Sequence, residues 1–219
     1  MMHSRNGRSR GRLSMFAGAA LMLATLGAAA CDSSSEPRTG AMTLLLTDAP
    51  GDVLAAVVTI DQIYLQSDVQ ADGACCEGRV VLVDEAFTTD LLTLQNTTQE
   101  IINGAVVPVG DYRQLRIVIS GAYLEVEAED GSSLIYASSP DYEGLPVDAV
   151  VAGNLQMPSF AQSGLKVNLP DGVVVINEDE TVTLIIDFDV AQSFGQAAGN
   201  SGQWVMTPVL NAAPPPPTL

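Results

Sequence analysis

Histidine is nearly absent from this chain of 219 residues, because His3 is the only one. His3 lies in an N-terminal segment that has the composition of a targeting signal, so the chain that remains after its removal contains no histidine. Such a chain cannot use a Ser-His or Cys-His pair in nucleophilic catalysis, and it cannot bind zinc or iron through imidazole nitrogens. Those classes of enzyme and metal site are therefore excluded.

Cysteine is also scarce, with three in the whole sequence. Cys75 and Cys76 are adjacent in DGACCEGR, where glycine and aspartate indicate a loop. Two neighbouring thiols cannot supply the four ligands of a zinc site by themselves. In an oxidising compartment they could form a vicinal disulfide or pair with another chain, and we expect a structural or incidental role rather than a redox function.

Positive charge is the third scarcity, with 9 Lys and Arg against 26 Asp and Glu. Four of the arginines lie in the first 12 residues, so removal of the leader leaves 5 basic residues and a formal charge of −21. This balance predicts no nucleic-acid partner, because the phosphate backbone would be repelled. It suits divalent cations or neutral ligands such as carbohydrates, or it serves solubility outside the cell.

Long apolar runs are confined to the N-terminus. Arg5 to Arg12 supply a positive region, Leu13 to Leu26 supply an apolar stretch too short to span a bilayer comfortably, and LGAAAC resembles the lipobox of bacterial lipoproteins. We therefore expect a lipoprotein signal peptide over residues 1–30, lipidation of Cys31, and a flexible tether over residues 31–40. A plain signal peptide with an incidental cysteine is the alternative. The predicted location is the bacterial cell envelope, outside the cytoplasm and anchored in a membrane by lipid.

A sustained helical period is absent as well. From Met42 onward, short runs rich in Val, Ile, Leu, Thr and Tyr are separated by turn sequences, which predicts an all-β fold. We expect two packed antiparallel sheets, a β-sandwich, over residues 41–211, followed by a Pro-rich disordered tail over residues 212–219. Asn103-Gly104 and Asp130-Gly131 predict hairpin turns.

Two aspartates end one of the most apolar runs, LIIDFDVAQSFG. If residues 182–190 form a strand, its even-numbered residues face the core, and Asp187 and Asp189 share the polar face about 7 Å apart. A calcium site could form if Asp48, Asp52 or backbone carbonyls completed the ligands. The same spacing fits the carboxylates of a glycoside hydrolase. The pair could also lie on a solvated face or take part in ion pairs.

The few remaining cations are candidate partners for these acids. Arg116 alternates with apolar residues in a predicted strand, and Lys166 is the only lysine in the chain. We predict that both form structural ion pairs with strand carboxylates. Lys166 as a ligand contact or a general acid is the alternative, but its pKa would have to be strongly lowered for proton transfer at neutral pH.

Five sequence motifs in this order are similar to those of a bacterial lipoprotein family with domain of unknown function 4382. They are TDAPGD (47–52), PVGDYRQLRIVI (108–119), PSFAQSGLKV (158–167), LIIDFDVAQS (184–193) and GQWVMTPVL (202–210). The resemblance covers about residues 40–210, and the Cys75-Cys76 loop departs from it. It implies an extracytoplasmic β-sandwich of the transthyretin-like or immunoglobulin-like kind, and no established reaction.

The sequence therefore predicts a lipid-anchored envelope protein with a non-catalytic binding or structural domain. The expected ligand is a divalent cation, with calcium as the cofactor, or a carbohydrate, and the expected partners are the membrane and an envelope protein or carbohydrate. The alternative is a carboxylate-based glycan hydrolase that acts through Asp187 or Asp189.

Overall fold

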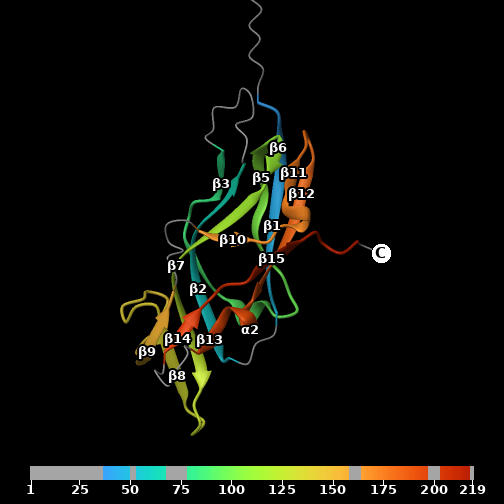
Figure 1. The fold of residues 1–219 in the computed structure, drawn as a ribbon. Coiled ribbons are helices and arrows are strands. Elements are labelled where there is room, and N and C mark those ends of the chain that lie inside the picture. Colours follow the sequence, from blue (N-terminus) through green and yellow to red (C-terminus); the bar gives the residue numbers. More distant parts are fainter. Residues whose placement is uncertain (1–36, 50–52, 68–77, 158–163, 197–202, 218–219) are drawn as a thin grey trace, which may run out of the picture. The chain divides into compact units, whose positions relative to one another are not determined.

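The computed structural model describes residues 37–49, 53–67, 78–157, 164–196 and 203–217, and this part of the chain is mostly β-strand, which confirms the all-β prediction (Figure 1). The strands are β1 (Thr39–Ala49), β2 (Ala55–Gln66), β3 (Arg79–Val83), β4 (Phe87–Asp90), β5 (Gln99–Pro108), β6 (Gly110–Tyr112), β7 (Gln114–Glu127), β8 (Ser133–Ala137), β9 (Val151–Gln156), β10 (Leu165–Val167), β11 (Val174–Ile176), β12 (Thr181–Asp189), β13 (Phe194–Gln196), β14 (Trp204–Met206) and β15 (Leu210–Ala213). Short helical turns are η1 (Leu91–Leu94), η2 (Pro170–Gly172) and α2 (Val190–Ser193).

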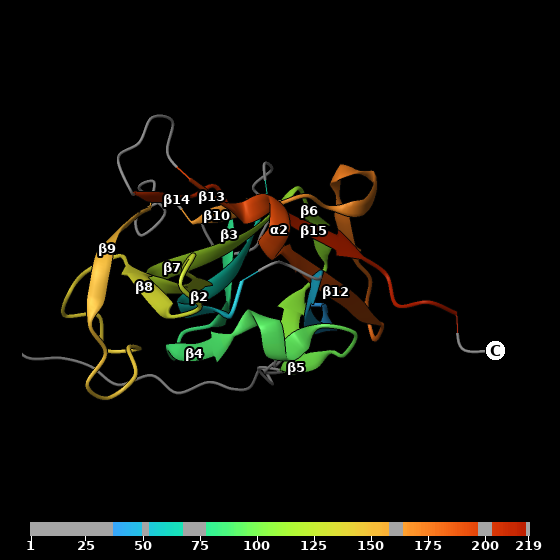
Figure 2. The ribbon, with the colours of Figure 1, turned by 90° about the horizontal axis from the view of Figure 1, so that it is seen from below.

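Two sheets contain most of these strands. One has four strands in the order β15-β12-β1-β5, and the other has nine, with the path β13-β14-β9-β8-β7-β2-β3 and with β10 on β7 and β4 on β2. β8 and β9 lie on the side away from β12 and β15 (Figure 2). The pairs β1–β12, β8–β9 and β14–β9 are parallel, so the expectation of purely antiparallel sheets is wrong. None of these pairs is joined by a tight hairpin, which is the connection that would force an antiparallel arrangement.

The inner faces of the two sheets share one hydrophobic core. Alternate residues of β1 and β12 point into it and lie opposite each other in parallel register, as the alternation predicted for residues 182–190 requires. β2 and β7 contribute the facing side. The central residues of this core are Met42, Leu44, Leu46, Ile60, Ile63, Leu115, Ile117, Leu184, Ile186 and Phe188.

A β-bulge lies in the middle of β2, where its register against β7 shifts between Thr59 and Gln62. Asp61 there accepts a hydrogen bond of 2.6 Å from the Ser120 hydroxyl on β7. The bulge changes which residues face the core, so Ile60 and Ile63 are both fully buried. The side chains along residues 57–65 therefore do not alternate strictly between the two faces of the sheet.

The two predicted hairpin turns have different outcomes. Asp130 and Gly131 do form the turn between β7 and β8, with Gly131 at φ 80° and the Asp130 carboxylate bonded to Ser132. Asn103-Gly104 lies inside β5, where Gly104 takes φ 62° at an irregularity in the pairing with β1 and donates its N–H to Thr43 Oγ1 at 3.1 Å. The Asn-Gly sequence that favours a type I′ turn forms a bulge here, because the turn and the bulge both need a residue with positive φ.

The segment between β8 and β9 covers part of the outer face of the nine-stranded sheet. Tyr142 packs at 6.4 Å from the Tyr123 ring, and its hydroxyl is 2.7 Å from Thr59 Oγ1. Gly121 and Gly144 both lie so close to the Tyr142 ring that a Cβ at either would overlap it. The two glycines thus form the slot that holds this aromatic ring.

The last part of the chain forms two separate strands, β14 and β15, which belong to different sheets. Pro208 stands in the break, and its missing N–H is consistent with the end of one ladder before the next begins. β15 extends to Ala213, and Ala212 is buried opposite Ile186. The sheet thus includes two residues of the segment expected to be a tail.

Candidate functional site

The corner at α2 is where the chain passes from the four-stranded sheet to the nine-stranded sheet. α2 follows β12 directly and leads into β13. Asp189 is its N-cap, and its Oδ1 accepts a hydrogen bond of 2.9 Å from the Gln192 N–H. The Gln192 side-chain amide also bonds Asp189 Oδ2. This aspartate therefore satisfies one of the backbone N–H donors that the short helix leaves open.

Asp48 supports the same corner from β1. It lies opposite Phe188 on the core side of the sheet, is only 4% exposed, and accepts the Val190 N–H at Oδ1 over 3.1 Å. Burial raises the pKa of Asp48 to about 6, and the nearby carboxylates of Asp187 and Asp189 act in the same direction. The hydrogen bond from Val190 and the amide of Gln95, which stands beside β1, lower the pKa but do not offset burial.

Asp187 lies on the other face of the same sheet. It stands opposite Thr47 in the parallel register, half-buried, and burial followed by the charge of Asp189 raises its pKa. Two carboxylate oxygens at this corner, Asp48 Oδ2 and Asp187 Oδ1, are buried and accept no hydrogen bond from the residues that the structure describes. An ionised oxygen in this condition is costly, which explains the direction of both pKa shifts.

The expected calcium ligands are only partly brought together. Asp187 and Asp189 share one sheet face and Asp48 faces the core, while Asp52 lies outside the described residues. Within the described ranges, no group of three or more His, Cys, Asp or Glu side chains is arranged to hold a metal ion. Calcium binding stays a proposal.

Residues that the sequence reasoning missed complete the corner. Ser193 is 1% exposed, and its hydroxyl accepts the Val209 N–H at 2.9 Å, while its carbonyl accepts the Thr207 N–H. Thr47 Oγ1 bonds the carbonyls of Leu94 and Thr97. Thr47 belongs to TDAPGD, Ser193 to LIIDFDVAQS, and Thr207 and Val209 to GQWVMTPVL, so three of the sequence motifs meet at one structural corner. The signal for these residues in the sequence was that they lie within the motifs on which the family resemblance rests.

A family model described as Domain of unknown function (DUF4382) matches residues 39–208. The chain belongs to this family. Neither the comparison with curated proteins nor that with solved structures finds a match. The residues of the DUF4382 domain that match the model begin with β1 and end just before β15, so they include the whole α2 corner.

The two cations expected in ion pairs lie side by side in the DUF4382 domain. Lys166 on β10 is the direct cross-strand partner of Arg116 on β7. Arg116 donates from Nε and Nη2 to Gln114 Oε1, at 3.0 and 2.9 Å, and from Nη1 to the Gly164 carbonyl at 3.0 Å. Ion pairs of these two residues with strand carboxylates stay a prediction.

Three other candidate residues fall outside the described part of the chain. These are Cys31, for lipidation, and Cys75 and Cys76, for a vicinal disulfide. Both expectations therefore stay predictions. In the described part of the DUF4382 domain, no helix has the length and apolar character needed to cross a bilayer.

Proposed function

We propose that this protein is lipid-anchored at the cell envelope and that its DUF4382 domain is a non-catalytic binding or structural module. The anchor follows from the leader, the small-residue run before Cys31 and the polar tether after it. The two sheets that share one core support a β-sandwich, which we assign to the transthyretin-like or immunoglobulin-like kind. Domains of this kind have a rigid surface on which a ligand can bind.

The observation that carries the non-catalytic part of the proposal is the use of the carboxylates at the α2 corner. Asp189 caps the helix, and Asp48 accepts the first N–H of the same helix. A carboxylate engaged with backbone donors in this way fixes the chain and is not poised for proton transfer to a substrate. Asp48 and Asp189 thus have structural roles that account for their positions.

The competing proposal, a glycan hydrolase, needs two carboxyl groups on either side of one glycosidic bond. Asp48 has the raised pKa that a general acid requires, but it is 4% exposed and faces the core. Asp187 and Asp189 lie on the opposite face of the sheet. Of the pair considered for this reaction, Asp189 is engaged as the N-cap of α2, which supports the non-catalytic proposal.

A second candidate function is cation binding on the polar face of the four-stranded sheet, favoured by the buried oxygen without a hydrogen bond, Asp187 Oδ1, next to Asp189 on the same face. A calcium ion is bound by six to eight oxygens, many of which can be backbone carbonyls or waters. It would offset the burial and the charge of Asp189 that together raise the pKa of Asp187.

Lipid anchoring is tested with the Cys31→Ser variant in cells fed labelled palmitate. We expect the wild-type chain to carry the label and to remain in the membrane fraction, and the variant to lose both properties. The matched control is Cys75→Ser with Cys76→Ser, which should keep the label. Label on Cys31→Ser, or unchanged fractionation of that variant, would contradict the anchor.

Cation binding is tested by thermal unfolding of the full chain in millimolar calcium. We expect the midpoint to rise, by about 2–4 °C for each kcal/mol of binding free energy. Asp187→Asn with Asp189→Asn should abolish the rise. Asp130→Asn with Asp141→Asn removes the same charge from exposed positions and should preserve it. A rise that is equal in both double variants, or no rise in the wild type, rules out this site.

A further inference from the structure

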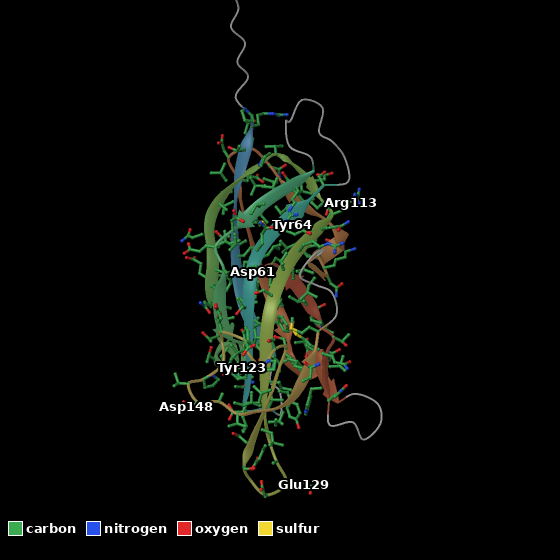
Figure 3. All side chains as sticks on the ribbon, turned by 90° about the vertical axis from the view of Figure 1, so that its left-hand side faces the viewer. Asp61, Tyr64, Arg113, Tyr123, Glu129 and Asp148 are labelled. Carbon is green, nitrogen blue, oxygen red and sulfur yellow. The ribbon has the colours of Figure 1, made fainter. Side chains whose placement is uncertain are left out.

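Asn103 and Gly104 lie in the bulge of β5, which is the last strand of the four-stranded sheet. The register of β5 against β1 shifts between Met42 and Leu44, so Asn103 and Gly104 both stand opposite Thr43. Both residues are exposed, and β5 is the strand at the left-hand margin of Figure 3. Water therefore reaches the peptide bond between them.

An asparagine that precedes a glycine can lose its side-chain amide without an enzyme. The Gly104 backbone nitrogen gives up its proton to water and bonds to Asn103 Cγ, while the bond from Cγ to Nδ2 breaks and that nitrogen takes up a proton and leaves as ammonia. Water then opens the resulting imide ring at either of its carbonyls, which leaves aspartate or isoaspartate. Water is the only co-reactant, and nothing is oxidised or reduced.

The bulge provides the space that ring closure needs. Gly104 has φ 62°, and apart from its chain neighbours no described atom lies within 4 Å of the place that a Cβ would take. A residue without Cβ also leaves its own nitrogen open to the approach of Asn103 Cγ. A strand at the edge of a sheet opens locally at a lower free energy than a central strand does.

Two hydrogen bonds restrain the reacting groups in the folded chain. The Gly104 N–H donates to Thr43 Oγ1 at 3.1 Å, and Asn103 Nδ2 donates to Glu100 Oε1 at 2.9 Å. The Gly104 nitrogen cannot bond to Cγ while its proton is held by Thr43, because the new bond takes the place of the N–H bond. Separation of the Gly104 N–H from Thr43 is therefore required before the ring can close.

We propose that Asn103 is a site of spontaneous conversion to aspartate and isoaspartate, and that the Thr43 hydroxyl controls the rate of this conversion. Isoaspartate lengthens the main chain by one carbon, which would shift the pairing at a regular strand position. The bulge already interrupts the pairing at Asn103, so the sheet can retain the modified chain. The new carboxylate replaces the hydrogen bond to Glu100 with repulsion between like charges. This inference does not depend on the ligand or the anchor of the protein.

The experiment incubates the purified full chain, in detergent, at mildly alkaline pH and follows the peptide that contains Asn103 by mass spectrometry. Isoaspartate is measured separately by its methylation with isoaspartyl methyltransferase. We expect both products at Asn103. Thr43→Val keeps a side chain of the same shape without the acceptor, and it should raise the rate by about two- to tenfold, the usual effect of one hydrogen bond.

The matched control is Thr183→Val. Thr183 is the direct partner of Thr43 on β12, on the side of β1 away from β5, so this change should leave the rate at Asn103 unchanged. Asn96 is exposed and also has positive φ, but it precedes Thr97 and should keep its amide. In urea, wild type and Thr43→Val should react at the same rate, because neither then has the hydrogen bond.

Absence of both products at Asn103, or equal conversion of Asn96, overturns the proposed site. The same rate in folded wild type and folded Thr43→Val, an equal acceleration in Thr183→Val, or a difference that persists in urea overturns the control by Thr43.

Discussion

Asp48 places a carboxyl group where the preceding alternate positions of its strand carry Leu44 and Leu46. The side chain is retained there because its Oδ1 receives the Val190 N–H, which would otherwise be unpaired at the start of α2. The cost is a second oxygen that no described residue bonds. At the residue scale, this group should therefore make the stability of the domain depend on pH.

Asp48→Asn tests that dependence by chemical unfolding at a series of pH values. The folded-state pKa of about 6 is above the ordinary value of 3.8, so the folded state binds the proton more tightly and the stabilisation is greatest at low pH. It falls as pH rises from about 4 to 6. Relative to Asp48→Asn, the wild type should lose about 2–3 kcal/mol between pH 4 and pH 7.

Asp130→Asn is a control of opposite sign. The hydrogen bonds from Ser132 lower the pKa of Asp130, so the wild type should gain stability relative to this variant as pH rises through the acidic range. Parallel stability curves for the wild type and Asp48→Asn would show that burial does not perturb Asp48. Burial and the charge of Asp189 also raise the pKa of Asp187. This effect is present in both the wild type and Asp48→Asn, so it largely cancels in the difference between their stability curves.

Among the elements, the segment between β8 and β9 depends on a single aromatic ring. Tyr142 lies in the slot between Gly121 and Gly144 and bonds Thr59 through its hydroxyl. Thr59 in turn lies 2.8 Å from the Thr88 hydroxyl on β4. The ring therefore connects this segment to β2, β4 and β7.

Gly121→Ala should destabilise the domain by about 1–3 kcal/mol, because the new methyl group would overlap the Tyr142 ring and force it out of the slot. Urea unfolding measures the loss. Gly195→Ala is the matched control, since a Cβ there meets no atom within 4 Å.

The double variant Gly121→Ala with Tyr142→Ala separates the overlap from other effects. With the ring removed, the added methyl group should cost much less than it does in the wild-type background. Additive losses in the double variant would refute a steric role for the ring.

Sequence patterns predicted elements best where a strand alternates strictly along its whole length. β12 alternates in this way, and its buried and half-buried residues are those expected. β2 begins with the same pattern, but its bulge at Asp61 depends on Ser120 of a partner strand 59 positions away. Asn103-Gly104 shows the same limit, because positive φ serves a turn or a bulge equally well.

For the whole molecule, the composition shows which residue types are scarce, but it does not show where the fold places those residues. The acids near the end of β12 were singled out from the sequence as a candidate site, which stays a prediction, but the approach of Asp48 to this strand end follows from the parallel pairing of β1 with β12. No local pattern contains that pairing. The placement of Lys166 beside Arg116 likewise comes from the pairing of β10 with β7, which residue spacing alone does not reveal.

The same parallel pairing has a consequence for the order in which the chain can fold. β1 is the first strand, and it lies in the middle of its sheet between β5 and β12, with Asp48 bonded to a residue 142 positions later. Contacts this distant in sequence form late, because the intervening chain must first be brought together. A chain that emerges from a ribosome or an export channel from its N-terminus would have to keep β1 half-paired until residues 181–189 arrive. The domain would therefore stay open through most of its passage and close only near the end.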